Sequence, residues 1–188
     1  GEVGELPEGL RGEDARVAIS HTRWATHGGV CEINAHPHLS CDGAIAVVHN
    51  GIIENYWQLR KELEKKGHKF VSETDTEVIP HLIEEFYEGN FSEAVRSAAT
   101  KLKGSYAVLA INKNSDELVG IRNESPLVLG LNENEFFLAS DVPAFLEYTK
   151  NVMLIDDGEM VIIKSKPVVK KINTGEEVKR EVRQVDWD

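Results

Sequence analysis

The feature of this sequence that most limits its fold is a nearly unbroken apolar run, Ala-Ile-Ala-Val-Val, at Ala44–Val48. A strand with one face in water alternates apolar and polar residues, so a run without alternation is typical of a strand buried on both faces. A second β-rich run, Arg16–Ser20, precedes it, and the polar loop between the two is rich in His, Gly and Pro. Loops of this length inside compact domains are often functional. We therefore expect a layered fold with a functional loop beside its central strand.

Helical patterns follow this strand. Glu54–Lys66 reads as a helix with an acidic start and a basic last turn, and a short strand is expected around Phe70–Val71. Thr74–Glu77 has the form of a capping box that opens a second helix. Ser92 is placed to cap a third helix over Glu93–Lys103.

Short strands dominate the second half of the chain. We predict strands at Tyr106–Asn112, Leu118–Arg122, Leu127–Leu131, Phe136–Ala139, Met160–Lys164 and Val168–Ile172. Asn173-Thr174-Gly175 is a hairpin-turn signal, and Asp141 with Pro143 predicts a short helix between strands. Helices grouped early and strands grouped late favour an α+β or layered αββα arrangement over alternating βαβ units. The length of 188 residues fits one domain spanning residues 1–188.

Composition narrows the possible partners. The chain has 21 Lys and Arg against 32 Asp and Glu, and a net charge of −11 repels nucleic acid and anionic membranes. We find neither a run approaching the roughly 20 apolar residues of a membrane helix nor a signal-peptide pattern. Cys31 and Cys41 read as ordinary loop or core thiols that suit a reducing cytoplasm, although one bridge between them stays open. We therefore predict a cytoplasmic protein with no nucleic-acid or membrane partner.

Asn50 and Gly51 come directly after the buried strand. At that place the Asn amide and the Gly backbone N–H can point at one spot, as an oxyanion hole requires. The alternative is that Asn-Gly simply makes a turn, which is its usual role.

Arg23 and Asp75 are the two charged candidates for substrate binding. A guanidinium binds a carboxylate through two parallel charge-assisted hydrogen bonds, but a lone Arg is more often part of a surface ion pair. Asp75 is suited to accept an ammonium group. An Asp at a helix start is also an ordinary helix cap, and the two roles can coexist.

Four histidines, His21, His36, His38 and His49, raise the question of a metal ion. No carboxylate or cysteine completes a recognised ligand pattern with them, and the nearest pair has one residue between its members. We expect them to anchor polar loops, and we predict no metal and no cofactor.

Several motifs in this order resemble the glutaminase domains of class II glutamine amidotransferases, nearest to the glucosamine-6-phosphate synthase family. They are HTRWATHG at 21–28, NAHPH at 34–38, VVHNGIIEN at 47–55, SETDTEV at 72–78, SPLVLG at 125–130 and FFLASD at 136–141. The resemblance implies a four-layer αββα sandwich of the N-terminal-nucleophile hydrolase type.

The resemblance also implies residue roles. In the family the position of Arg23 holds the α-carboxylate of glutamine, and that of Asp75 binds its α-amino group. The positions of Asn50 and Gly51 form the oxyanion hole.

Three further positions match the family less decisively. Thr26 and His27 match residues that line the glutamine pocket, and Trp24 matches one that helps close an ammonia passage toward a synthase domain. For all three, packing in the core or in the loop is the alternative.

The sequence departs from the family at its nucleophile. In the family an N-terminal Cys attacks the glutamine carboxamide and its own α-amino group is the base, whereas residue 1 here is Gly and Cys31 and Cys41 are internal. The first strands of the fold and the sugar isomerase domains, which bind fructose 6-phosphate, have no counterpart. We expect an N-terminally incomplete domain that is inactive without the upstream Cys. We also expect its exposed sheet edges to favour aggregation, swapping, a partner segment or a homo-oligomer.

Three functions stay open at this point. The first is a glutaminase that hydrolyses L-glutamine to glutamate and ammonia for glucosamine 6-phosphate synthesis. The second is a non-catalytic glutamine-binding regulatory module. The third is the glutaminase domain of another class II amidotransferase. The motifs HTRWATHG and SETDTEV favour the amino-sugar family over this third function.

Overall fold

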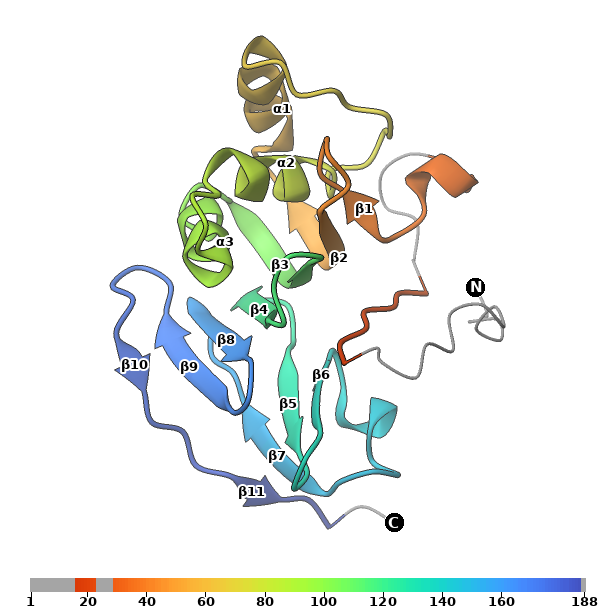
Figure 1. Cartoon of the computed structure of the whole chain (residues 1–188). Helices are drawn as coiled ribbons and strands as arrows, with labels where there is room; N and C mark the ends of the chain where they lie inside the picture. The colour runs from red at the N-terminus through yellow and green to blue at the C-terminus, as the bar shows by residue number, and fades with distance from the viewer. Residues whose placement is uncertain (1–15, 23–28, 187–188) are drawn as a thin grey trace.

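A computed structural model describes residues 16–22 and 29–186 of the 188-residue chain. Three α-helices, α1 (Tyr56–Lys65), α2 (Val78–Glu85) and α3 (Phe91–Ala99), come before most of the strands (Figure 1). None of the helices in these ranges is both long enough and apolar enough to cross a membrane.

The larger sheet has seven antiparallel strands in the order β1-β2-β3-β4-β8-β9-β10. Their bounds are β1 His38–Leu39, β2 Ile45–Ile53, β3 Gly104–Asn112, β4 Leu118–Asn123, β8 Glu159–Ile163, β9 Pro167–Lys171 and β10 Glu177–Val178. The longest pairing joins β2 to β3 over nine positions, from Ile45 opposite Asn112 to Ile53 opposite Gly104. The candidate site lies on this pairing.

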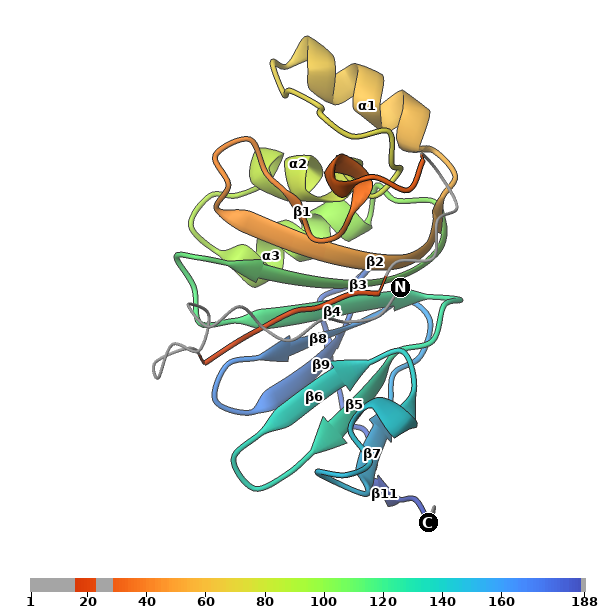
Figure 2. The same ribbon diagram turned by 90° about the vertical axis from the view of Figure 1, so that its right-hand side faces the viewer.

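The smaller sheet has four antiparallel strands in the order β11-β7-β5-β6. They are β5 Val128–Leu131, β6 Phe136–Ala139, β7 Asn151–Leu154 and β11 Arg183–Gln184. A 3-10 helix, η3 (Val142–Ala144), lies between β6 and β7. Figure 2 shows this sheet at the end of the molecule away from α1.

Three apolar cores define the layers. The largest lies between the helices and one face of the seven-stranded sheet, and the second lies between the two sheets. Along β3 the side chains alternate between them, since Val108 and Ala110 belong to the first core whereas Leu109 and Ile111 pack against the second. The third core lies where η3 and the residues after it cover the smaller sheet. The predicted layered α+β class is confirmed, and the apolar run of β2 is buried as expected.

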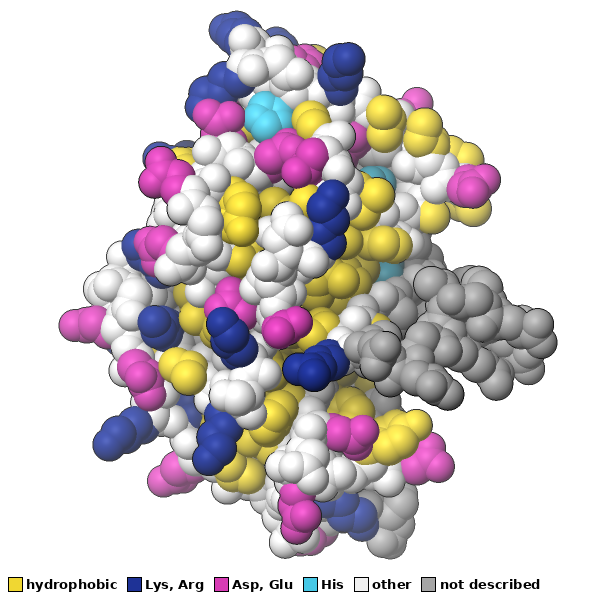
Figure 3. Space-filling model, viewed as in Figure 1, with side chains coloured by type: hydrophobic (Ala, Val, Ile, Leu, Met, Phe, Trp, Pro, Cys, Tyr) yellow, Lys and Arg dark blue, Asp and Glu magenta, His cyan; other side chains and the backbone are white. Residues whose placement is uncertain are grey.

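The surface carries charge of both signs. On the face drawn in Figure 3, acidic and basic side chains are interspersed, and apolar side chains show between them. Cys31 and Cys41 are both exposed free thiols, so the bridge between them that the sequence left open is not formed.

Most predicted elements are present, and two strands are not. Phe70–Val71 and Arg16–Ser20 are extended but pair with no described strand, although Val17 and Ile19 pack against the core between the sheets. Strand β7 and the two-residue strands β1, β10 and β11 were not predicted, and the two-residue strands are too short for an alternating pattern to signal them. The hairpin turn at Asn173–Gly175 and the short helix after Asp141 are confirmed.

Two predicted helix caps are wrong. Asn90, not Ser92, caps α3, because its side-chain oxygen accepts the backbone N–H of Glu93 at 3.1 Å and the helix begins at Phe91. The helix also ends at Ala99 rather than at Lys103. Glu77 directly precedes α2 without a side-chain cap, so the expected capping box does not form.

Asn90→Ala should lower the free energy of unfolding by about 1 kcal/mol, because it leaves a backbone N–H of the first turn of α3 without its acceptor. Urea denaturation would measure the change. Ser92→Ala is the matched control, since the Ser92 hydroxyl donates to Asn90 Oδ1 rather than capping the backbone. A larger loss from Ser92→Ala than from Asn90→Ala would contradict this assignment.

Candidate active site

Strand β2 brings two of the sequence motifs together. It runs through Asn50 and Gly51 to Ile53, and the Ile53 backbone N–H donates to Asp75 Oδ2 at 2.8 Å. On the same strand, His49 Nδ1 lies 2.9 Å from Thr76 Oγ1. The end of β2 and the segment at 72–77 are therefore one structural unit, although more than twenty residues separate them in the sequence.

The sequence suggested that Asn50 and Gly51 follow the buried strand. Instead, both residues lie inside β2. Gly51 is opposite Tyr106 on β3, so the pair does not form a turn. Gly51 has φ +112°, and a Cβ there would lie 2.0 Å from the carbonyl oxygen of Ser105. Only glycine fits this position, because a side chain would be both sterically excluded and conformationally strained.

The Asn50 side chain is exposed, and among the described residues it contacts the N-terminal region. Its Oδ1 is 2.7 Å from His21 Nε2, at hydrogen-bonding distance. Asn50 and His21 also line a cavity of about 460 Å³ between the two sheets, whose wall includes the apolar Leu127 and Leu138 and the polar His49 and Ser140. The Asn50 amide therefore belongs to a cavity of mixed polar and apolar character.

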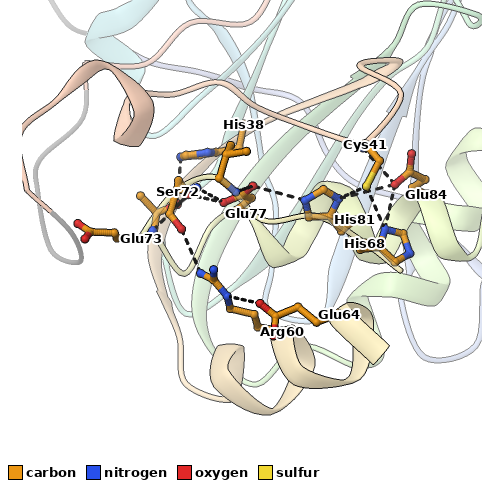
Figure 4. Close-up of polar contacts among 12 residues, drawn as sticks. His38, Cys41, Arg60, Glu64, His68, Ser72, Glu73, Glu77, His81 and Glu84 are labelled. Carbon is orange, nitrogen blue, oxygen red and sulfur yellow. Dashed lines mark hydrogen bonds and ion pairs between the residues drawn. The ribbon is translucent and has the colours of Figure 1, made fainter. Parts of the chain in front are cut away.

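A buried carboxylate fixes the segment that carries Asp75. Glu77 accepts the backbone N–H groups of Val71 and Ser72 at 2.8 and 2.7 Å and the Ser72 hydroxyl at 2.5 Å (Figure 4). Burial opposes ionisation of the Glu77 carboxyl, but contacts with His81, Ser72 and these N–H groups outweigh it and lower its pKa to about 2. Glu77 is therefore an ionised group that closes the 71–77 loop, which is why it does not complete a capping box.

Helix α1 holds the same loop from the other side. Arg60 donates to the Ser72 carbonyl at 3.0 Å and to Glu64 at the same distance, and its guanidinium lies over the ring of Phe70. With the 71–77 loop tied to both α1 and α2, Asp75 is held in place and is 3% exposed.

The histidines anchor polar loops, as predicted. His36 Nε2 lies 3.2 Å from Thr76 Oγ1, and His38 Nε2 lies 3.1 Å from Thr74 Oγ1. The rings of His21 and His36 are 4.1 Å apart. These contacts join the 34–38 motif to the 72–77 motif.

Three of the predicted site residues, Asn50, Gly51 and Asp75, lie in the described part of the chain. Asn50 and Gly51 lie on β2 and Asp75 contacts the end of the same strand at Ile53, but Asp75 does not line the cavity beside Asn50. Arg23, Trp24, Thr26 and His27 lie outside the described residues. Residue spacing did not single out the structural roles of Glu77 and Thr76, because these depend on contacts between distant segments.

The model of the glutamine amidotransferase domain family matches residues 21–147. Glutamine–fructose-6-phosphate aminotransferase (isomerizing) of Thermococcus kodakarensis is 53% identical, and the match covers 100% of this chain and 32% of that protein. The proteins of the same name from Methanocaldococcus jannaschii and Thermus thermophilus are 53% and 50% identical, covering 92% and 98% of this chain and 17% and 30% of theirs. The chain thus spans about a third or less of the length of these relatives.

Solved structures agree on the fold. The glutamine phosphoribosylpyrophosphate amidotransferase of B. subtilis, in complex with ADP and GMP, matches with a TM-score of 0.70 at 27% identity. A structure described as the allosteric regulatory enzyme of purine biosynthesis gives the same TM-score at 29% identity, and each match covers 82% of this chain and 34% of the other. The predicted N-terminal-nucleophile type of fold is therefore confirmed. Because the family model matches well over half of its residues, the chain belongs to the glutamine amidotransferase domain family.

Proposed function

We propose that this chain is the glutamine-binding part of the glutaminase domain of a glutamine–fructose-6-phosphate aminotransferase. The observation that supports the proposal is the hydrogen bond from the Ile53 N–H to Asp75, which ties the Asp75 carboxylate to β2, the strand that carries Asn50 and Gly51. About half of the residues are identical to those of the relatives with that name, whereas the purine enzymes match at 27% and 29% identity. This difference supports fructose 6-phosphate as the ammonia acceptor over the acceptor of the purine enzymes.

In this proposal each end of glutamine has its own partner. Asp75 binds the α-ammonium group and Arg23 binds the α-carboxylate through paired charge-assisted hydrogen bonds. Thr26 and His27 line the pocket, and Trp24 closes it toward the acceptor domain. Recognition of both charged groups on the α-carbon would select L-glutamine and L-glutamate over the D-isomers.

Catalysis in this proposal proceeds through a thioester. A cysteine supplied by a segment upstream of this chain attacks the side-chain carboxamide, the tetrahedral oxyanion is stabilised at Asn50 and Gly51, and ammonia leaves. Water then adds to the thioester, releasing glutamate and restoring the thiol. The ammonia passes to fructose 6-phosphate in a sugar isomerase domain, the partner that completes glucosamine 6-phosphate synthesis.

The deciding experiment measures glutamate and ammonia released from L-glutamine. It compares the chain alone with the chain extended at its N-terminus by the cysteine-bearing segment of a close relative, and with a Cys→Ala version of that extension. We expect turnover only with the intact cysteine. Binding of glutamine without turnover in all three would favour the regulatory module, and no binding by a folded extended chain would exclude both functions.

Asp75→Asn in the extended chain should raise the KM for L-glutamine about tenfold or more, because it removes the negative charge opposite the ammonium group while keeping an acceptor for Ile53. Steady-state kinetics would measure this. Asp116→Asn is the matched control, since Asp116 is an exposed carboxylate outside the proposed site. An unchanged KM in Asp75→Asn would remove Asp75 from the proposal.

Gly51→Ala in the extended chain should lower kcat by about a hundredfold or more, the loss typical of a damaged oxyanion hole. The reason is that the new Cβ must displace the Ser105 carbonyl. Gly67→Ala controls for backbone strain, because Gly67 has a similar φ of +101° with nothing within 4 Å of its Cβ position. If circular dichroism shows both variants folded and both retain the kcat of the unsubstituted extended chain, Gly51 has no part in turnover.

A further inference from the structure

Four potential metal ligands meet beside α2, where His81 also faces Glu77 of the 71–77 loop. They are Cys41 from the turn after β1, His68 from the segment after α1, and His81 and Glu84 from α2. Figure 4 shows all four side chains directed toward one point. We propose that this cluster is a structural zinc site, assigned by neither the sequence motifs nor the family.

The distances between the ligand atoms fit a tetrahedral zinc ion. Cys41 Sγ lies 3.5 Å from His68 Nδ1 and 3.4 Å from His81 Nδ1. Glu84 Oε2 lies 3.1 and 3.6 Å from the same two nitrogens, and all four atoms are within 4.8 Å of one another. Zinc bonds of about 2.3 Å to sulfur and about 2.0 Å to nitrogen or oxygen leave about 3.5 Å between S and N and about 3.3 Å between N and O. Four of the six distances between ligand atoms therefore lie within a few tenths of an ångström of those of a tetrahedral site.

The outer nitrogens of both imidazoles face carboxylates. His68 Nε2 lies 3.1 Å from Glu85 Oε2, and His81 Nε2 lies 3.5 Å from Glu77 Oε1. A carboxylate at Nε2 favours the tautomer with its proton there, which leaves Nδ1 as a lone-pair donor facing the cluster. This pairing of a metal-binding histidine with an outer carboxylate is the usual arrangement at protein zinc sites.

The backbone fixes the fourth ligand. The N–H groups of Cys41 and Asp42 donate to Glu84 Oε2 and Oε1, each at 3.2 Å, so the carboxylate is oriented without a metal. His81 is 1% exposed and packs against the Phe70 ring, whereas the Cys41 thiol is exposed. The cluster is thus rigid on its inner side and accessible from the Cys41 side.

The donor set selects the ion. One thiolate and two imidazoles suit Zn2+ better than Mg2+ or Ca2+, which prefer oxygen ligands, and zinc also accepts the one carboxylate. Thiolate and carboxylate together carry the charge of −2 that a divalent cation neutralises. The alternative is a metal-free network in which His68 contacts Glu84 and Glu85 and the Cys41 thiol hydrogen-bonds to an imidazole nitrogen, and zinc titration distinguishes the two.

The test uses the whole chain, freed of metal by a chelator and titrated with Zn2+ alone. Calorimetry and elemental analysis should give one ion per chain, and Co2+ in its place should show a thiolate-to-cobalt charge-transfer absorption band. Cys41→Ser should abolish the band and weaken binding by at least about tenfold, the smallest loss that a change in an outer partner alone produces. Cys31→Ser, the second exposed thiol, is the control and should change neither.

Two measurements keep the test decisive if Cys41→Ser fails to fold. Glu84→Gln should weaken zinc binding while keeping the side-chain shape, and in the unmodified chain Zn2+ should protect Cys41 but not Cys31 from alkylation by iodoacetamide. The proposal is overturned if the folded chain takes up no zinc. It is also overturned if Cys41→Ser and Glu84→Gln both bind zinc as tightly as the unmodified chain does. Because no readout depends on glutamine turnover, failure here leaves the proposed function untouched.

Discussion

The ionised carboxylate of Glu77 joins the main parts of the site to the helical layer. It accepts two backbone N–H groups and one hydroxyl from the 71–72 segment, and on its other side it faces His81 of α2. A buried charge is stable only when hydrogen bonds and opposite partial charges replace its lost water, and here they do so well enough to depress the pKa. The loop geometry, the start of α2 and the placement of Asp75 all depend on this compensation.

The second constraint is steric and belongs to the sheet. Close approach of β2 and β3 at Gly51 leaves no room for a side chain, so the strand passes the Ser105 carbonyl and continues to Ile53. The Ile53 N–H then donates to Asp75. A strand that ended at His49 would lack this donor, and the 72–77 segment would lose its contact with the sheet. The backbone conformation of one glycine thus connects the two motifs.

Local sequence signals predicted the elements better than the contacts between them. The apolar run at Ala44–Val48 identified β2, but Asn50-Gly51 resembles a turn, and only pairing with β3 shows that the strand continues. Asn90 and Ser92 are both good capping residues, and the start of α3 at Phe91 decides between them. The contact between the end of β2 and Asp75 joins segments more than twenty residues apart, so no local spacing predicts it.

Local sequence patterns do not predict the Cys41 cluster, because its four ligands come from separate segments of the chain. Only His81 and Glu84 share an element, and their separation of three residues occurs in many helices without a metal. His68 lies after α1 and Cys41 in a turn, so no local pattern connects them to α2. The histidines that did attract attention, at 21, 36, 38 and 49, instead pack against one another or against hydroxyl and amide groups.

The strand order of the larger sheet has a consequence for the biogenesis of the protein. β4 pairs with β8, placing Arg122 opposite Glu159, yet β5, β6 and β7 are synthesised between them and belong to the other sheet. During translation β2, β3 and the helices can assemble while the outer edge of β4 still has no partner, because β8 has not yet emerged from the ribosome. Unpaired edges recruit other strands, and long-range pairings form slowly. In the interval between synthesis of β4 and β8, the unpaired edge of β4 therefore exposes the nascent chain to mispairing with strands of other chains.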